Sequence, residues 1–351
     1  MRPKVLIVDD DASVRYTLNA ILEEEDVDIE EAADGREALD RVLAEPVDLI
    51  LTDLKMPRMD GMTLLSELKA LPNPPRVVMI TAFGSERLAV EAMKRGAVDY
   101  FAKPFEPDDI VSVVRRNLET VRLADENRSL RAELLLRRHM VFESEGMRQV
   151  ARMVERVSPR DVTVLITGES GTGKELVARA LVDGSPRKDE PYVRFNCAAL
   201  PRELADAELF GHSRGAFTGA EKARNGLVRQ AHKGTLLLDE VGELDPATQG
   251  KLLRVLQEKE VRPVGETAPV QVDVRFMAAT NRDLKRDVER GRFREDLYYR
   301  LHVITIHVPP LAERRADIRP LAQHFAARFG RSYGLGEVRL SPKVLEILCA
   351  A

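Results

Sequence analysis

Cysteine is scarce in this 351-residue chain: Cys197 and Cys349 are the only two, and they match no metal-site spacing. This scarcity excludes a disulfide framework and favours a reducing compartment, so we expect a cytoplasmic protein with both cysteines in its cores. Long apolar runs are absent too, since none approaches the ~20 residues needed to cross a bilayer. Residues 1–4 lead straight into a short apolar run without a cleavage site, so we expect neither secretion nor a membrane partner.

A basic surplus is also missing, because 54 Lys and Arg stand against 58 Asp and Glu, for a formal net charge of −4. Modules that bind nucleic acid usually carry a basic surplus or a basic stripe. The composition therefore indicates no general attraction to DNA. The length of 351 residues predicts about two domains, each of roughly 150 residues.

The chain alternates short apolar runs with amphipathic stretches from residue 4 to about residue 118. The runs predict strands at Val5–Val8, Val47–Leu51, Val77–Ile80 and Tyr100–Ala102, and residues 36–44 predict a helix. Such alternation is typical of a parallel sheet covered by helices. Polar residues stand where strands end: Asp9, Asp10, Asp11, Asp53, Thr81 and Lys103, which precedes Pro104. We expect them to meet, because ligands of an open parallel sheet bind outside the carboxyl ends of its strands.

This cluster of strand-end residues predicts phosphoryl chemistry. Clustered carboxylates repel one another, and a hard cation such as Mg²⁺ relieves that repulsion while it bridges to phosphate oxygens. Asp53 can then attack a phosphoryl donor while the metal and the Lys103 ammonium neutralise charge, and Thr81 can hydrogen-bond a phosphoryl oxygen. The competing interpretation is a row of helix N-caps, which we favour for Asp11 alone.

A charged helix is predicted after Pro107 and continues to about Met140, past the end of the first domain. Its apolar stripe includes positions that fit the d, a, d and a sites of a heptad: Leu123, Asn127, Leu130 and Leu134. Because Asn at an a site favours a paired register, the stripe predicts a dimeric coiled coil. A solvated linker helix docked on its neighbour is the alternative.

A second alternating region starts near Glu145 and predicts another covered parallel sheet. Its strands are expected at Val162–Thr167, Tyr192–Asn196, Thr235–Asp239, Phe276–Thr280 and Val303–His307. After Pro309 and Pro310 the pattern predicts only helices, at residues 318–329 and 342–349.

A glycine-rich segment links the strand at 162–167 to a predicted helix. It reads Gly168-Glu169-Ser170-Gly171-Thr172-Gly173-Lys174-Glu175. In this setting the backbone N–H groups and the helix N-terminus face phosphate oxygens, and Lys174 reaches the terminal phosphates. The segment therefore predicts a phosphate-binding loop. Glu175 stands where a Ser or Thr usually binds magnesium, which leaves metal coordination open.

Two acids end the strand at 235–239, beside the predicted phosphate loop. We expect Asp239 to orient Mg²⁺ and Glu240 to position or deprotonate an attacking water. Asn281 follows the strand at 276–280 and Asn196 ends the strand at 192–196. The side-chain amide of Asn196 can hold Glu240 until the nucleotide state changes.

Two arginines, Arg294 and Arg300, are candidates to complete the nucleotide site of a neighbouring subunit. A solvated helix charge is the alternative for each of them.

Residues 208–220 read Glu-Leu-Phe-Gly-His-Ser-Arg-Gly-Ala-Phe-Thr-Gly-Ala. Small residues flank Phe217 and Thr218 on both sides: Gly215, Ala216, Gly219 and Ala220. A flexible tip that carries an apolar side chain is costly to expose without a partner. A buried turn is the alternative.

Together these motifs resemble the NtrC-like activators of sigma-54 RNA polymerase. The receiver part carries Asp9-Asp10, Asp53 with Met56-Pro57 and Asp60-Gly61, Thr81-Ala82, and Lys103-Pro104-Phe105. The ATPase part carries residues 168–175, Phe195-Asn196-Cys197, residues 215–220 and Phe293-Arg294-Glu295-Asp296-Leu297. The resemblance implies an α/β architecture. It consists of a flavodoxin-like receiver with a doubly wound five-stranded parallel sheet (1–118), a helical linker (119–142), an AAA+ P-loop domain (143–310) and a partial helical lid (311–351).

The resemblance also implies roles for single residues. In the receiver, Asp53 is the phospho-acceptor, and Asp10 with Asp9 and the Lys55 carbonyl hold the metal. Thr81 and Tyr100 are the switch residues, because Thr81 moves toward the phosphoryl group and Tyr100 turns inward. In the ATPase, which uses ATP and Mg²⁺, Glu175 is the family's own form of the loop. The implied ATPase roles are Asn196 as glutamate switch, Asn281 as sensor, and Arg294 and Arg300 as trans-acting fingers. Phe217 and Thr218 contact sigma-54, assisted by a second loop at 264–269.

The implied partners are sigma-54 RNA polymerase, a cognate sensor histidine kinase and further copies of the chain, as an inactive dimer and an active ring, usually a hexamer. Typical members continue with Trp-Pro-Gly-Asn-x-Arg-Glu-Leu and a DNA-reading helix-turn-helix. Neither occurs in these 351 residues, so we expect an incomplete lid and no DNA contact by this chain itself. If the lid prevents turnover, the chain is instead a phospho-switch or interaction protein. A generic AAA+ motor is a third interpretation, which the Phe217-Thr218 tip disfavours.

Overall fold

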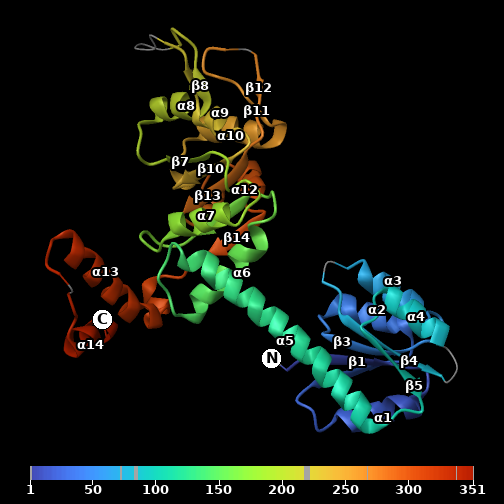
Figure 1. Ribbon diagram of the computed structural model, residues 1–351. Helices are drawn as coiled ribbons and strands as arrows, with labels where there is room; N and C mark the ends of the chain where they lie inside the picture. The colour runs from blue at the N-terminus through green and yellow to red at the C-terminus, as the bar shows by residue number, and fades with distance from the viewer. Residues whose placement is uncertain are drawn as a thin grey trace. The chain divides into compact units, whose positions relative to one another are not determined.

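The computed structural model describes residues 2–71, 73–82, 86–216, 222–266, 268–336 and 338–350. The chain divides into two compact units, Met1–Asn127 and Arg128–Ala351. Helix α5 (Pro107–Arg137) runs unbroken through this boundary, which confirms the long helix predicted after Pro107 (Figure 1). Among the described residues, no helix combines the length and apolarity that a membrane span requires.

The first unit contains one parallel sheet in the strand order β2-β1-β3-β4-β5. Before α5, its elements are β1 (Lys4–Val8), α1 (Ala12–Leu22), β2 (Asp28–Ala32), α2 (Gly35–Ala44), β3 (Leu49–Asp53), α3 (Gly61–Lys69), β4 (Arg76–Ala82), α4 (Glu86–Arg95) and β5 (Asp99–Lys103). Val5 and Ile7 are buried with Leu18 of α1 and Ile110 of α5, whereas Leu6 lies in a second cluster with α2, α3 and α4. Helices therefore cover both faces, and the doubly wound flavodoxin-like fold is confirmed.

Strand β2 was not among the predicted runs, because its sequence Asp28-Ile29-Glu30-Glu31-Ala32 is mostly charged. It forms an edge of the sheet, where charged side chains are common because they discourage pairing with other chains. Glu30 is paired there with Lys4 of β1, at 2.7 Å. Strand β3 also differs from the prediction, because it begins at Leu49 rather than Val47.

The second unit contains a parallel sheet in the order β14-β6-β13-β10-β7. Its strands and helices up to β10 are α6 (Glu145–Val157), β6 (Val164–Thr167), α7 (Lys174–Asp183), β7 (Tyr192–Asn196), α8 (Arg202–Phe210), β8 (Gly211–His212), β9 (Arg224–Asn225), α9 (Leu227–Gln230) and β10 (Thr235–Asp239). The remaining elements are η1 (Val241–Glu243), α10 (Pro246–Glu258), β11 (Glu260–Val261), β12 (Val270–Gln271), β13 (Arg275–Thr280), α11 (Leu284–Glu289), α12 (Glu295–Leu301), β14 (Ile304–His307), η2 (Leu311–Glu313), η3 (Arg315–Asp317), α13 (Ile318–Ser332) and α14 (Pro342–Ala350). All five predicted strands are present in this sheet.

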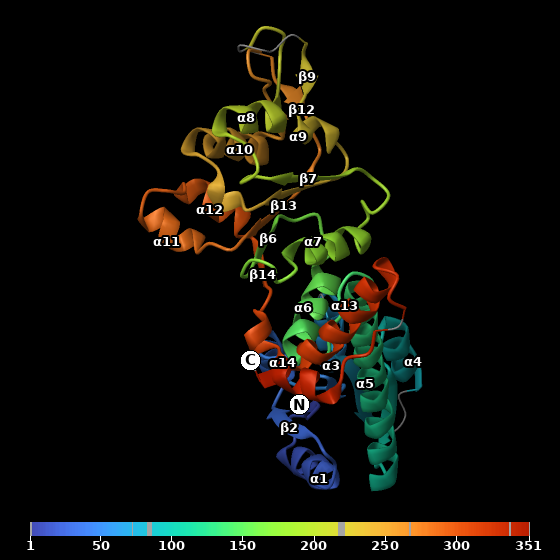
Figure 2. The same cartoon turned by 90° about the vertical axis from the view of Figure 1, so that its left-hand side faces the viewer.

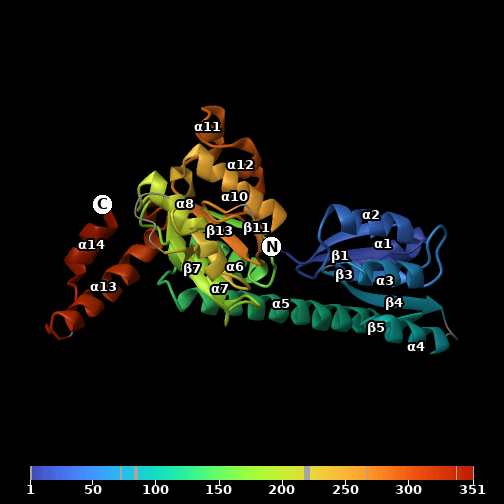
Figure 3. The same cartoon turned by 90° about the horizontal axis from the view of Figure 1, so that it is seen from above.

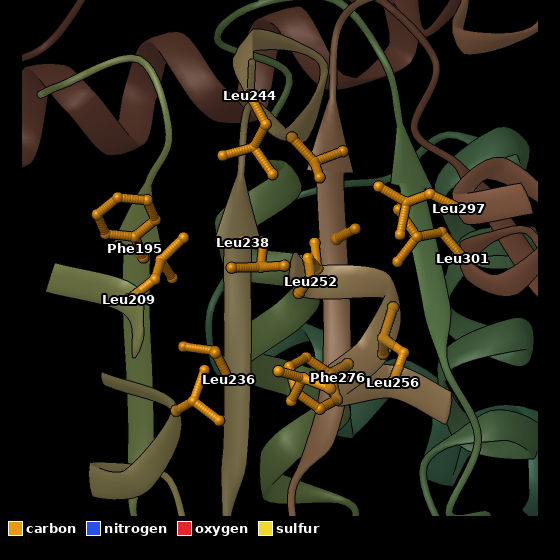
Figure 4. Close-up of a cluster of buried hydrophobic side chains, with 14 of the residues drawn as sticks. Phe195, Leu209, Leu236, Leu238, Leu244, Leu252, Leu256, Phe276, Leu297 and Leu301 are labelled. Atoms are coloured by element: carbon orange, nitrogen blue, oxygen red, sulfur yellow. The ribbon is translucent and has the colours of Figure 1, made fainter. Parts of the chain in front are cut away.

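Two apolar clusters hold the second sheet between its helices. One face of β10 presents Leu236 and Leu238 to α10 and α12, and Figure 4 shows their side chains gathered with Leu252 and Leu297. The other face presents Leu237 to a cluster that includes α6 and α7. Each fully buried leucine stabilises the fold by about 1.5–3 kcal/mol. These clusters fix the loops that follow the strands.

Two short hairpin-like sheets, β8–β9 and β11–β12, lie at the same end of the second unit (Figure 2). The predicted helices after Pro310 are confirmed as α13 and α14, which form a separate helical pair (Figure 3). Cys197 is buried as expected, but Cys349 is only half-buried, because α14 packs mainly against α13.

Candidate functional sites

A cluster of charged side chains lies at the carboxyl edge of the first sheet. Asp9 follows β1, Asp53 ends β3 and Lys103 ends β5. The Lys103 Nζ atom lies 2.7 Å from Asp9 Oδ2 and 2.8 Å from Asp53 Oδ1. Thr81 is buried on β4, which lies between β3 and β5. The structure thus brings the predicted residues of these strands to one edge.

Lys103 offsets part of the negative charge of this cluster. Asp9 is 1 % exposed, and burial raises the pKa of its carboxyl group although Lys103 opposes that change. Burial alone would lower the pKa of Lys103, but its bonds to Asp53 and Asp9 outweigh burial and raise it. One ammonium between two carboxylates therefore makes a partly buried acidic site tolerable.

The neighbouring acids have different surroundings. Asp11 caps helix α1, since its Oδ1 accepts a hydrogen bond of 2.8 Å from the Ser13 amide. Bonds from the Ser13 hydroxyl and amide hold the pKa of Asp11 below its usual value. The capping role favoured for Asp11 is confirmed, whereas Asp10 is exposed to solvent.

The donor atoms of the cluster suit a hard cation. The carboxylates of Asp9 and Asp53 and the carbonyl of Lys55 are oxygen donors of the kind that Mg²⁺ prefers. Within the part of the chain that the structure describes, no group of three or more His, Cys, Asp or Glu side chains is already arranged around a metal position. The residues fit Mg²⁺ by their chemistry, and the metal site stays a prediction.

The loop after Asp53 is held close to it. Asp53 Oδ2 accepts a hydrogen bond of 2.8 Å from the Lys55 amide. A β-carbon at Gly61 would lie 2.2 Å from the Asp53 carbonyl oxygen, so only glycine fits there. Tyr100 is 45 % exposed, and its predicted inward movement stays a prediction.

In the second unit, the glycine-rich segment forms the loop between β6 and α7. Three glycines adopt positive φ angles, of 154° at Gly168, 79° at Gly171 and 99° at Gly173. Side chains larger than glycine rarely adopt such angles. Gly173 is the residue before α7, so the loop delivers its backbone directly to a helix N-terminus, as a phosphate-binding loop requires.

Lys174 is folded back over this loop. Its Nζ atom donates to the Gly168 carbonyl at 3.0 Å and to the Glu169 carbonyl at 3.1 Å. The side chain is 6 % exposed, and it also lies 3.5 Å from Glu240 Oε1. A nearly buried ammonium at a helix N-terminus is suited to hold phosphate oxygens.

Glu175 points to the neighbouring strand. Its carboxylate pairs with the Arg194 guanidinium of β7. The position that usually carries a magnesium ligand is therefore occupied by half of an exposed ion pair, so Glu175 supplies no metal ligand in this arrangement.

The acids after β10 lie beside Lys174. Glu240 has a φ angle of 50°, a conformation uncommon for a residue with a side chain. Its Oε2 accepts a hydrogen bond of 3.2 Å from the Asn281 amide. Burial and the Glu240 charge raise the pKa of Asp239. Non-glycine residues with such backbone angles cluster at functional sites, which agrees with a chemical role for Glu240.

The two asparagines differ in what they contact. The backbone N–H of Asn281 donates a hydrogen bond to Glu240. Asn281 also lines a cavity of about 420 Å³ together with Gly168 and Glu169. Asn196 Oδ1 accepts instead from the Ala198 amide, at 2.9 Å. The contacts described for Glu240 are thus with Lys174 and Asn281, and its predicted restraint by Asn196 stays a prediction.

Neither arginine has a described bond to Asp239 or Glu240 of its own chain. Arg294 forms two bonds to Asp296, of 3.1 and 2.7 Å, and its side chain is 47 % exposed. Arg300 donates to the Leu256 carbonyl at 3.4 Å. Arg294 directly precedes α12 and Arg300 lies within it, and their predicted contribution to a neighbouring subunit stays a prediction.

A second cavity, of about 460 Å³, lies on the other side of the phosphate loop. Residues 137–141, residues 169–173 and the lid residues Leu311, Arg314, Leu321 and His324 contribute to its lining. Arg314 is buried and donates to the Thr172 carbonyl at 3.0 Å. Asp317 is fully buried and accepts bonds from the amides of Glu143 and Ser144.

Sequence reasoning missed this wall of the site. It assigned residues 119–142 to a linker and the region after 311 to a lid without functional residues. Neither Arg314 nor Asp317 belongs to a spacing pattern that we recognised. A usable signal would have been charged residues immediately before an amphipathic helix, which is too common to be specific.

The segment predicted to contact sigma-54 lies only partly in the described structure. Gly215 and Ala216 are described, whereas Phe217, Thr218, Gly219 and Ala220 lie outside the described residues. The base of this segment is bonded to the second predicted loop, since the Ser213 amide donates to the Val264 carbonyl at 3.0 Å and the Val264 amide to the Gly211 carbonyl at 2.8 Å. Hydrogen bonds thus join the two predicted loops at their base.

Two family models match the chain. Residues 5–115 match the response regulator receiver domain, and residues 140–307 match the sigma-54 interaction domain.

Known relatives are similar to the chain over most of their own length. The transcriptional regulatory protein ZraR of Escherichia coli (strain K12) is 44% identical over 345 residues, which cover 98% of this chain and 78% of that protein. The DNA-binding transcriptional regulator NtrC of Salmonella typhimurium is 42% identical over 339 residues, covering 97% and 72%. The crystal structure of NtrX from Brucella abortus in complex with ATP is similar with a TM-score of 0.57 and 36% identity, covering 100% of this chain and 76% of that one.

Proposed function

Because the chain belongs to the NtrC-like sigma-54-dependent response regulators, we propose that phosphorylation of Asp53 controls an ATPase that remodels sigma-54 RNA polymerase. The observation that carries this proposal is the presence of two sets of phosphate-handling groups in one chain. Lys103 is clamped between Asp9 and Asp53 in the first unit, and Lys174 faces Glu240 across a glycine loop in the second.

In the receiver, the Asp53 carboxylate is the nucleophile toward a phosphoryl group from a sensor histidine kinase. Lys103 Nζ already lies 2.8 Å from Asp53 Oδ1, so its ammonium can neutralise negative charge on the phosphoryl group transferred to Asp53. Thr81 supports a hydrogen bond to a phosphoryl oxygen. Mg²⁺, held by Asp9, Asp10, Asp53 and the Lys55 carbonyl, would supply additional charge neutralisation.

In the ATPase, the backbone of residues 168–173 and Lys174 hold the phosphates of ATP. Glu240 positions the attacking water and Asp239 orients the metal ion. The backbone N–H of Asn281 donates a hydrogen bond that holds Glu240. The relative NtrX has been solved with ADP and with ATP, which supports nucleotide binding in this family. The cavity of about 460 Å³ beside the loop has room for the nucleoside part.

The active form is proposed to be a ring of identical subunits, in which Arg294 and Arg300 reach the site of the next subunit. The Arg294 side chain is exposed, and the bonds described for its guanidinium go to Asp296, which leaves the guanidinium accessible. Leu123, Leu130 and Leu134 of α5 are 55, 61 and 62 % exposed. This stripe supports the paired coiled coil proposed for the inactive dimer, with a helix docked on its neighbour as the alternative.

The contact with sigma-54 is proposed to use Phe217 and Thr218. Because residues 211–213 and 264 are hydrogen-bonded, the two loops are expected to move together when the nucleotide changes. A sigma-54 pull-down should succeed with the parent chain and fail with Phe217→Ala. Retention by the variant would favour a generic AAA+ motor.

The decisive experiment measures the rate of ATP hydrolysis against protein concentration, with and without beryllofluoride as a phosphoryl mimic. We expect the rate per subunit to rise with concentration and with the mimic, because both promote ring assembly. In Asp53→Ala the response to the mimic should vanish while nucleotide binding remains. A chain that binds the mimic but never turns over ATP would instead be a phospho-switch or interaction protein.

A further inference from the structure

Gln249 is a polar residue on an otherwise apolar face of α10. It precedes Leu252, Leu253 and Leu256 by three, four and seven positions, which places all four on one side of the helix. These leucines are buried in the cluster shared with α12, where Figure 4 shows Leu252 and Leu256 near Leu297 and Leu301. Gln249 itself has no exposed surface. A buried polar side chain in such a position usually has a specific task.

The carboxamide of Gln249 is hydrogen-bonded at both ends. Its Nε2 donates to the Leu244 carbonyl at 2.7 Å and to the Arg292 carbonyl at 3.1 Å. Its Oε1 accepts from the Arg294 amide at 2.8 Å. Two of these three bonds therefore go to the backbone on either side of Phe293.

The segments joined in this way lie next to two different candidate catalytic residues, Glu240 and Arg294. Leu244 follows η1, the turn directly after Glu240. Arg292 and Arg294 lie in the segment that leads into α12, and Phe293 between them is buried in the same apolar cluster. Gln249 thus fixes the backbone from which the exposed Arg294 side chain extends.

We propose that Gln249 is a positioning residue for the trans-acting arginine. It sets the backbone of residues 292–294, and so the reach of the Arg294 guanidinium into the nucleotide site of the next subunit. The inference rests on the proposed function of Arg294. It adds that the same amide ties this reach to the turn after the subunit's own Glu240, so that a change at one site is transmitted to the next.

Hydrophobic packing alone does not set this position. The leucines of α10 hold α12 against the sheet. Apolar contacts are non-directional, however, so they do not fix the exact position of a backbone segment. The directional hydrogen bonds between Gln249 and the Arg292 carbonyl and Arg294 amide fix that position. Loss of the amide should therefore displace the segment while leaving the helices packed.

The test uses two inactive chains that complement each other in a mixed ring. Arg294→Ala has an intact Glu240 but lacks the Arg294 guanidinium that the next subunit needs, whereas Glu240→Gln supplies Arg294 but lacks the catalytic acid. Mixing them with beryllofluoride and ATP should restore turnover. Gln249→Met, which keeps the length of the side chain without its polar atoms, is then added to one partner at a time.

We expect Gln249→Met to reduce the restored turnover by about 10-fold or more when it is in the Glu240→Gln partner, which supplies the arginine. In the Arg294→Ala partner the same substitution should leave turnover within about 2-fold. Gln257→Met, an exposed position on the same helix, is the matched control for both. Equal losses in both partners would indicate a merely structural role and overturn the inference, as would no loss in either.

Hydrogen exchange provides a measurement that needs no ring. The Arg294 N–H should exchange faster in Gln249→Met than in the parent, while the amides of residues 298–301 in α12 keep their protection. Unchanged exchange at Arg294 would overturn the inference. Failure of the proposed function has a different signature, because Arg294→Ala alone would then hydrolyse ATP at the parent rate.

Discussion

The two units differ in how a lysine is placed beside clustered acids. Each places a lysine beside two acids at the carboxyl edge of a parallel sheet. In the receiver, Lys103 bonds to both acids, at 2.7 and 2.8 Å. In the ATPase, Lys174 bonds to carbonyls of its own loop and approaches Glu240 only to 3.5 Å. Both sites therefore keep one negative charge in excess, but the lysines are used differently. We call the receiver site closed, because Lys103 is bonded to both of its acids, and the ATPase site open, because Lys174 is bonded to its own loop and only approaches Glu240.

The acids at the strand ends also fall into two groups in both units. Burial raises the pKa of Asp9 and of Asp239, which lie beside the two lysines. Asp11 and Asp245 cap helices, and hydrogen bonds hold their pKa values below the usual one. The structure thus separates two acids beside lysines, to which we assign chemical roles, from two acids that cap helices, although in each unit the two kinds follow a strand or turn within a few residues of one another.

The largest expected effect tests the open site. Glu240→Gln keeps the shape of the side chain but removes the carboxylate that we assign to the attacking water. Hydrolysis should fall by on the order of 10³-fold, because a positioned base contributes about 10²- to 10⁴-fold. Nucleotide affinity, measured by equilibrium binding of a fluorescent ATP analogue, should change little. Glu243→Gln is the control, since Glu243 lies in η1 and pairs with Arg282 at 2.5 Å. Comparable hydrolysis by the two variants would remove Glu240 from the mechanism.

The next effect tests the closed site. Lys103→Met removes the ammonium shared by Asp9 and Asp53, so phosphoryl transfer to Asp53 should slow by about 10²-fold, the usual cost of losing one preorganised stabilising group. The measurement is the rate of phosphorylation by acetyl phosphate at saturating Mg²⁺. In Lys55→Met, which preserves the backbone amide bonded to Asp53, the rate should stay close to that of the parent. If Lys103→Met phosphorylates at the parent rate, the contrast between a closed and an open site is broken.

Much of this arrangement could be predicted from the sequence, because it depends on local patterns. Strand, glycine loop and helix in succession predict the placement of Lys174, and acids after apolar runs predict Asp53 and Asp239. The charged edge strand β2 was missed, since its position in the sheet, and not its composition, makes it a strand. The positive φ angle of Glu240 and the buried amide of Gln249 could not be predicted either. Both depend on contacts between segments far apart in the chain.

The smallest expected effect concerns Asp245, an acid of the capping kind. Its Oδ1 accepts from the amides of Ala247 and Thr248, at 2.9 and 3.2 Å, at the start of the helix that carries Gln249. Asp245→Ala should lower the free energy of unfolding of the ATPase unit by about 1 kcal/mol at pH 7, as loss of an N-cap usually does. The urea midpoint of the far-ultraviolet signal measures this, with Asp245→Asn as the variant that retains a cap.

The pH dependence of that difference distinguishes a cap from an acid placed for chemistry. Burial alone would raise the pKa of Asp245, but bonds from the Thr248 hydroxyl and the amides outweigh it and hold the pKa below 3.8. A carboxyl group whose pKa is lower in the folded state stabilises the fold above its unfolded pKa, and this stabilisation is lost as the pH falls through the lowered value. The difference between parent and Asp245→Ala should therefore be constant from pH 7 to pH 5 and shrink only below about pH 4. A difference that already shrinks between pH 7 and pH 5 would place Asp245 with Asp9 and Asp239, and the separation of the two kinds of acid would not hold.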